Sequence, residues 1–192
     1  MLSRPMMTIL AAAASFCAAV TAAPTLGQEI ALDLDPARTI VEFTLADVLH
    51  TVHGNFKLKH GAIRFDPATG KISGEVVVDA ASGESGSPAR DRRMHKNILE
   101  SERYPEIVFT PDHVEGTVAP VGVSQVQVHG TFRIHGAGHE LTLPVQVRIA
   151  NGQATATTHF TVPYVKWGMK NPSNLFLRVS EKVDIGITAY AR

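Results

Sequence analysis

The chain has 192 residues, with 18 basic and 18 acidic side chains, so its formal net charge at neutral pH is zero. A balanced charge gives no overall attraction to nucleic acid or to an acidic membrane surface. The single cysteine, Cys17, lies in the N-terminal segment, so the rest of the chain has no disulfide, thiol nucleophile or cysteine-bound metal.

The N-terminal segment has the pattern of a secretory signal peptide. Arg4 precedes a stretch of small and apolar residues that is too short to span a bilayer. We expect residues 1–23 to be removed, with Gly27 as the latest alternative cleavage point. Residues 30–192 then form one exported, periplasmic domain that is large enough to build its own core and has no segment for stable membrane insertion.

Almost the whole chain beyond this segment alternates apolar and polar residues with a period of two. Val41, Phe43 and Leu45, for example, fall on one face of a predicted strand, with polar residues between them on the other face. Such alternation is typical of antiparallel strands that have one apolar and one hydrated face. Turn sequences such as residues 66–70 and 151–152 separate the strands. About eight strands of this kind predict an all-β fold, either a sandwich or a closed barrel.

One segment in the middle of the chain departs from the alternation. Ser87 is a typical N-cap residue, and Pro88 is favoured at the first position of a helix. Met94 and Ile98 follow at the i,i+4 spacing of a helical face, and the residue before Pro105 ends the segment. We therefore predict one short helix here.

The pentapeptide Val-His-Gly-x-Phe occurs at residues 52–56 and again at 128–132, and looser copies surround Gly74 and Gly116. The copies are unevenly spaced, so no sequence repeat explains them. The glycine of each copy lies on the apolar face of its predicted strand. Closing a sheet into a barrel requires bends and close backbone approach at such inward positions. The motif then has a geometric role, and its histidines point outward.

The histidines do not predict a metal site. His50 and His53 lie on opposite faces of a strand. His129, His135 and His139 converge only if the intervening turn folds back, and no carboxylate stands at a diagnostic spacing. Exposed histidines without a ligand are the better interpretation.

No catalytic motif is recognisable either. The chain has no Gly-x-Ser-x-Gly nucleophile turn, and the glycine-rich residues 83–87 lack the lysine of a phosphate-binding loop. We therefore expect a protein that is not an enzyme and that needs no cofactor or metal.

The predicted helix carries a dense basic cluster of Arg90, Arg92, Arg93 and Lys96, with His95 among them. Nucleic-acid binding is not expected, because the charge is balanced and aromatic platforms are missing. The simplest interpretation is a solvated helix face. The alternative is a site for an anionic headgroup at the mouth of a barrel.

A barrel of eight strands is wide enough either to fill its interior with side chains or to hold one small ligand. Inward glycines leave space, and Trp167 lies in an irregular stretch, residues 164–181, that would suit a rim. The sequence alone does not decide between an interior filled with side chains and one that holds a ligand.

Three blocks of sequence resemble the YceI-like, polyisoprenoid-binding domains. They are residues 52–67, residues 90–109 with their Arg-Asp and Tyr-Pro pairs, and residues 130–145. The blocks follow the order of the family, and the match as a whole runs from about Asp33 to Thr188. Residues 164–169 depart from the family pattern, as does the second half of the helix.

The resemblance implies an antiparallel, up-and-down, lipocalin-like barrel with a short capping helix. It also implies an exported protein that encloses a long isoprenoid chain, such as a polyprenyl lipid or an isoprenoid quinone, for transport or sequestration. The alternative is a barrel with a packed core that serves as a non-catalytic interaction module. A homodimer through an exposed strand face is left open.

We expect inward-facing apolar residues to line the lumen, with Arg90 and His95 as candidates for contact with a headgroup. The expected lining residues are Val41, Phe43, Phe56, Ile63, Phe65, Val76, Ile107, Phe109, Val128, Phe132, Leu143, Val145, Trp167 and Ile185.

Overall fold

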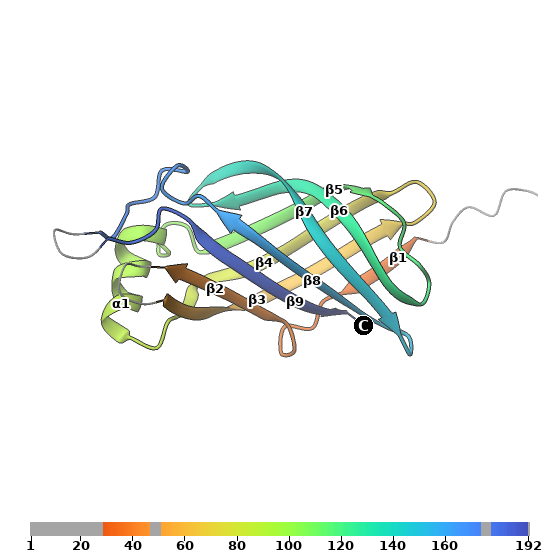
Figure 1. Cartoon of the computed structure of the whole chain (residues 1–192), viewed down its shortest axis with the longest axis horizontal. Helices are drawn as coiled ribbons and strands as arrows, with labels where there is room; N and C mark the ends of the chain where they lie inside the picture. Colours follow the sequence, from red (N-terminus) through yellow and green to blue (C-terminus); the bar gives the residue numbers. More distant parts are fainter. Residues whose placement is uncertain (1–28, 47–50, 174–177, 192) are drawn as a thin grey trace, which may run out of the picture.

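The computed structural model describes residues 29–46, 51–173 and 178–191, so the expected signal peptide lies outside the described residues. The described chain is built almost entirely from antiparallel strands (Figure 1). They are β1 (Ile30–Asp33), β2 (Ile40–Ala46), β3 (Thr51–Asp66), β4 (Lys71–Glu84), β5 (Glu106–Glu115), β6 (Gly122–Ile134), β7 (Ala137–Ala150), β8 (Gln153–Val162) and β9 (Val183–Ala191).

The strands close into a barrel. From β3 to β9 each strand pairs with the next in sequence, and β2 pairs with both β3 and β9. Strands β1 and β2 lie one after the other along β3, and an isolated bridge between Leu34 and Ala191 connects the end of β1 to β9. The two short strands share one position in the wall, which leaves eight positions in a closed ring. The up-and-down barrel is confirmed, and the sandwich is excluded.

One helical segment covers one end of the barrel (Figure 1). It consists of α1 (Pro88–Arg93) and a wider π-helical turn, η1 (Met94–Leu99), so the short helix predicted after Ser87 is confirmed. Ser87 occupies the N-cap but forms no capping hydrogen bond with its side chain. The carboxylate of Asp91 instead accepts a hydrogen bond from the backbone N–H of Ser85, at 2.9 Å, and so ties the helix to the end of β4. Among the described residues, no helix has the length and hydropathy needed to cross a bilayer.

The glycines of the repeated pentapeptide allow close packing inside the barrel. A Cβ atom on Gly54 would lie 2.3 Å from the ring of Phe43, and one on Gly130 would lie 2.4 Å from a backbone oxygen of β5. The geometric role predicted for the motif therefore holds at these two positions. The looser copies differ, because Gly74 and Gly116 have φ angles of 109° and 107° and so provide a left-handed backbone conformation.

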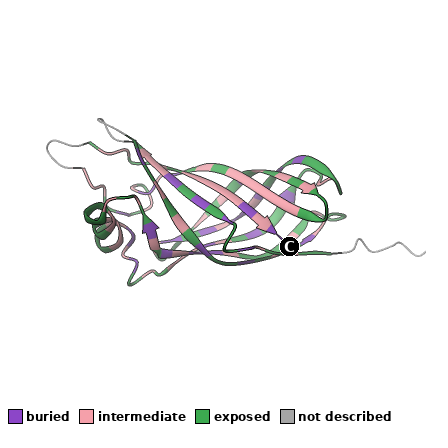
Figure 2. Cartoon of the chain, turned by 90° about the horizontal axis from the view of Figure 1, so that it is seen from below, coloured by how far each residue is buried: buried purple, intermediate pink, exposed green. Residues whose placement is uncertain are grey.

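The interior of the barrel has two different halves. At the end away from the helix, the buried residues Phe65, Val114, Val126 and Val128 form a continuous apolar cluster, which we call the packed half. These residues lie near the β3–β4 and β5–β6 turns, whereas the helix connects the opposite ends of β4 and β5. Buried and partly buried residues alternate with exposed ones along the walls (Figure 2). The other half, beneath the helix, contains a cavity.

Candidate functional site

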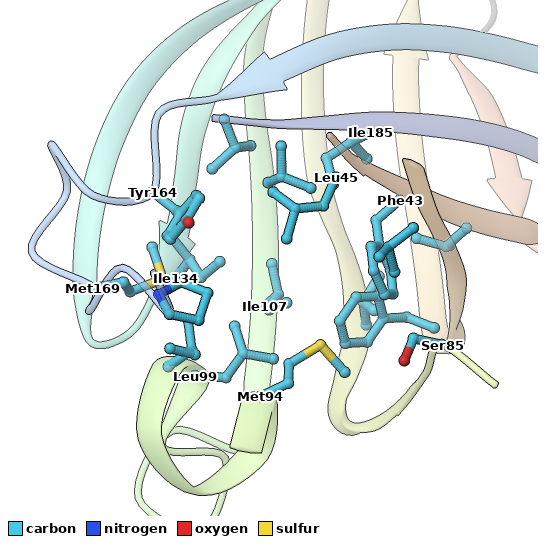
Figure 3. Close-up of a pocket in the computed structure, with 18 of the residues that line it drawn as sticks. Phe43, Leu45, Ser85, Met94, Leu99, Ile107, Ile134, Tyr164, Met169 and Ile185 are labelled. Atoms are coloured by element: carbon cyan, nitrogen blue, oxygen red, sulfur yellow. The ribbon is translucent and has the colours of Figure 1, made fainter. Parts of the chain in front are cut away.

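The helix end of the barrel encloses an apolar cavity of about 430 Å³. This volume lies within the range of about 300–1,000 Å³ that is usual for small-molecule sites. Phe43, Leu45, Ile107 and Ile185 point into the cavity from the strands (Figure 3). None of the described residues that line it is a histidine, a cysteine or an acid.

The strand walls of the cavity follow directly from the alternation. Phe43 on β2 is directly opposite Ile185 on β9, as Val41 is opposite Ile187, so these side chains project on the same inner face. Phe43 also packs against Phe56 of β3, with ring centroids 5.4 Å apart. The pairing gives this part of the wall a continuous aliphatic and aromatic surface.

The roof of the cavity comes from the helical segment and from the long β8–β9 connection. Met94 and Leu99 reach down from η1, and Tyr164 and Met169 approach from the connection (Figure 3). The hydroxyl of Tyr164 donates a hydrogen bond to the backbone oxygen of Ser180 at 2.7 Å, which ties the two ends of the connection together. Burial raises the pKa of Tyr164 to about 12, so this group stays a neutral donor.

Charge is confined to one side of the cavity, where Ser85, Arg90 and Arg93 lie. The Arg90 guanidinium donates one hydrogen bond to the hydroxyl of Ser85 at 2.7 Å and another to its backbone oxygen at 2.8 Å. Within the described ranges, the side chain of Arg93 has no hydrogen-bond or ion-pair partner. The rim therefore presents one oriented cation and one cation that is free to contact a ligand.

The structure brings together only part of the set of residues expected to line the lumen. The predicted residues that line the cavity are Val41, Phe43, Phe56, Ile107, Phe132, Ile185 and Arg90.

Another group of the predicted residues does not line the cavity. Phe65, Val128 and Val145 belong to the packed half, where inward side chains from neighbouring strands meet one another, and Phe109 packs against the clusters of both halves. Leu143 is buried opposite Val128. The remaining two are Ile63, which is paired with Gly74, and Val76, which packs against the cluster of Val41, Leu58 and Val78.

Trp167 and His95 also lie outside the cavity wall, because each packs against another part of the mouth. The ring of Trp167 stacks on His139, with centroids 3.9 Å apart and planes 5° apart, and its other neighbour is Phe132. Burial lowers the pKa of His139. His95 is hydrogen-bonded through Nε2 to the backbone oxygen of Gly83 at 2.9 Å, so it holds the helical segment against β4.

Sequence reasoning missed several residues of the roof and the rim. The helical spacing identified Met94 as part of an apolar helix face, but it did not indicate which strands that face would contact. Tyr164 and Met169 come from an irregular segment in which no periodicity marks the inward side. Arg93 was seen only as one member of a basic cluster, and the helical spacing that puts it beside Arg90 could have identified it.

The three histidines that a turn could bring together do not converge. His135 lies beside Tyr104 and Glu100, and His139 lies against Trp167. His129 is on the outer wall with two carboxylates that the sequence spacing did not reveal. His53 also faces outward, as predicted, whereas His50 lies outside the described residues.

Comparison with solved structures gives the same architecture. Burkholderia cenocepacia BcnA is similar at a TM-score of 0.70, with 19% identity over 83% of this chain and 99% of that chain. A polyisoprenoid-binding domain from Saccharophagus degradans, implicated in plant cell wall breakdown, has a TM-score of 0.66 and 14% identity over 84% and 97%. The Campylobacter jejuni YCEI protein has a TM-score of 0.61 and 19% identity over 75% and 86%. At these identities the likeness establishes the fold.

A search of the curated proteins finds no match. The family model for the YceI-like domain, however, matches residues 32–191, which is almost the whole described chain. The resemblance noted in three blocks of the sequence therefore extends over the complete barrel, and the chain belongs to the YceI-like family.

Proposed function

We propose that the protein binds a long isoprenoid chain, as part of a polyprenyl lipid or an isoprenoid quinone, and transports or sequesters it in the periplasm. The observation that carries this proposal is the apolar cavity of about 430 Å³ beneath the helix. The similar domain from Saccharophagus degradans is described as polyisoprenoid-binding, which supports the same class of ligand. The interaction-module alternative requires a core packed throughout, and the cavity argues against it.

Burial of a hydrocarbon chain is sufficient to drive binding without any catalytic group. Each buried methylene contributes about 0.8 kcal/mol, so roughly ten of them approach the ~8 kcal/mol that corresponds to micromolar affinity, before the costs of association. An apolar lining with its few polar groups on one side suits a ligand with a long tail and a small head. The proposed role is therefore binding.

The head of the ligand would lie beside Arg90 and Arg93 at the rim. Two guanidinium groups three residues apart on one helix can contact an anionic or strongly electronegative group such as a phosphate or a quinone oxygen. His95, the other residue considered for this role, already uses one ring nitrogen to hold Gly83. Arg93 takes its place in the proposal because it lines the cavity and has no described partner.

Mass spectrometry of an organic extract of the protein, purified from its native periplasm, tests the ligand class directly. We expect an isoprenoid species in about one copy per protein in the wild type. Leu45→Glu should lose it, because an unpaired carboxylate would face the apolar cavity. Thr44→Glu is the matched control: it is adjacent, faces His53 on the outer wall, and should retain the lipid. An extract free of lipid, or equal retention by a folded Leu45→Glu variant, would refute the proposal.

The headgroup contact is tested separately with two neighbouring arginines. Arg93→Gln should weaken binding of a polyprenyl phosphate about tenfold and leave binding of the corresponding alcohol nearly unchanged, because only the phosphate gains from the cation. Arg92→Gln is the control, since Arg92 does not line the cavity. Equal losses for both variants would show that the rim contributes only general positive charge. Equal losses for both ligands would show that Arg93 does not act through the charge of the headgroup.

A further inference from the structure

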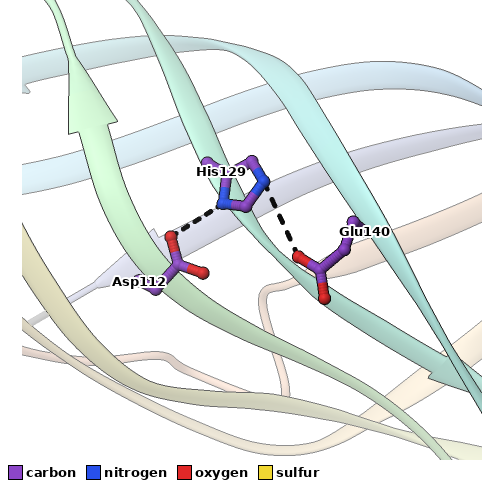
Figure 4. Close-up of side chains that lie close together, drawn as sticks. All are labelled: Asp112, His129 and Glu140. Atoms are coloured by element: carbon purple, nitrogen blue, oxygen red, sulfur yellow. Dashed lines mark hydrogen bonds and ion pairs between the residues drawn. The ribbon is translucent and has the colours of Figure 1, made fainter.

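A second cluster of functional side chains lies on the outer wall of the barrel, away from the cavity. Three adjacent strands contribute one residue each: Asp112 from β5, His129 from β6 and Glu140 from β7 (Figure 4). His129 Nδ1 lies 2.8 Å from Asp112 Oδ1, and its Nε2 lies 3.6 Å from Glu140 Oε2. One nitrogen and one oxygen from each acid all lie within 4.8 Å of one another.

The fold holds these groups in place through the register of the strands. The pairing of β5 with β6 shifts between Pro111 and His113, so Asp112 is an extra residue without an opposite partner on β6. Such a bulge redirects a side chain, and here the carboxylate reaches the imidazole of His129. On the other side Glu140 is opposite Thr131, whose hydroxyl donates a hydrogen bond to Glu140 Oε1 at 2.9 Å. That bond orients the carboxylate, as outer-shell partners do around metal ligands.

The electrostatic environment favours a cation. The carboxylates of Asp112 and Glu140 lie beside His129, and their negative charges attract a cation. A metal ion binds the imidazole in its neutral form, so it would replace a proton at this position. The side chains are partly exposed, at 42% for His129, 54% for Asp112 and 65% for Glu140, so they can rotate and leave room for water ligands.

We propose that Asp112, His129 and Glu140 form a binding site for a divalent transition-metal ion such as Zn²⁺. Imidazole and carboxylate are ligands that zinc accepts at about 2.0–2.2 Å, and a site with three protein ligands completes its coordination with water. The ion would displace the direct hydrogen bond between His129 and Asp112 and bind one imidazole nitrogen and one oxygen of each acid. Because all three residues lie on the outer wall, the site operates independently of the lipid cavity.

Isothermal titration calorimetry with ZnCl₂ on the purified, tag-free protein, stripped beforehand with a chelator, tests the proposal. We expect one saturable site in the wild type. His129→Ala should abolish it, and Asp112→Asn and Glu140→Gln should each weaken it at least tenfold. His60→Ala is the matched control, because His60 pairs with Glu75 on another part of the wall and does not belong to the cluster of three ligands. This control should bind like the wild type.

Thermal unfolding provides a second measurement that does not depend on the heat of binding. An ion that binds only the folded state raises the Tm, so Zn²⁺ should stabilise the wild type and the His60 variant, should stabilise Glu140→Gln less, and should not stabilise His129→Ala. If the protein has no saturable site, or if zinc binding is unchanged in both His129→Ala and Glu140→Gln, the three residues form only a hydrogen-bonded ion pair and the proposal is wrong. Lipid extraction results do not bear on this outcome.

Discussion

The two halves of the barrel use the same strands and the same kinds of residue but have different interiors. In the packed half Phe65, Val126 and Val128 meet across the barrel, whereas beneath the helix Phe43 and Ile185 leave a cavity of about 430 Å³. Alternation therefore determines which side chains point inward, but it does not determine whether they touch.

The difference arises from how the ends of the barrel are closed. At the packed end the connections are short turns such as residues 67–70 and 151–152, and the walls come together. At the other end a helical segment and the β8–β9 connection cover the opening, and Leu99 and Tyr164 fill only its top. Phe109 packs against the residue clusters of both halves and so lies at the boundary between them.

The largest effect is expected from removing one aromatic ring from each half. Phe65→Ala should lower the free energy of unfolding by about 3–5 kcal/mol, because it opens a void in a packed core. Phe160→Ala should cost only about 1–2 kcal/mol, since the Phe160 ring already borders a cavity and mainly its transfer free energy is lost. Urea denaturation of delipidated protein measures both values. Equal losses would mean that the two halves are equally packed.

A smaller effect is expected at the boundary between the halves. A Cβ atom in Gly130→Ala would lie 2.4 Å from the backbone oxygen of Thr110 and 3.0 Å from the ring of Phe109. Because backbone must move, we expect a loss of about 1–3 kcal/mol. Gly138→Ala on β7 is the control, since its added methyl meets only a threonine methyl group, at 3.1 Å. The same urea titration compares them, and a tolerated Gly130→Ala would show that the wall is more adaptable than proposed.

The smallest effect concerns a turn at the packed end. Asp66 accepts hydrogen bonds from the Thr69 hydroxyl at 2.7 Å and from the Ala68 backbone N–H at 2.9 Å, and these bonds hold the pKa of its carboxyl below the usual value. A depressed folded-state pKa gives stability that is complete above the unfolded pKa and is lost as the pH falls through the folded pKa. NMR titration of the carboxyl carbon between about pH 5 and pH 2 measures the shift.

Thr69→Ala should move the pKa of Asp66 back toward its usual value and remove most of this pH dependence, while the cavity at the other end is unaffected. A pKa for Asp66 that is already at the usual value in the wild type would contradict the structure of the turn.

The sequence by itself determined the all-β fold, the position of the helix and the geometric role of Gly54 and Gly130. These features depend on local patterns, since a period of two, an N-cap next to proline and a glycine at an inward position can be recognised within a few residues. The family resemblance added the expectation of a closed barrel, which the structure confirms, and the ligand class that is proposed above.

Only the tertiary structure decided where the cavity lies and which residues surround it. Phe65 and Phe43 both point inward from their strands. What separates them is that Phe65 packs against Val126 and Val128, whereas Phe43 lines the cavity. Likewise, Asp112, His129 and Glu140 come together because a bulge shifts the register of β5 against β6. Both outcomes depend on how distant strands are positioned around the closed ring, and no local pattern in the chain contains that information.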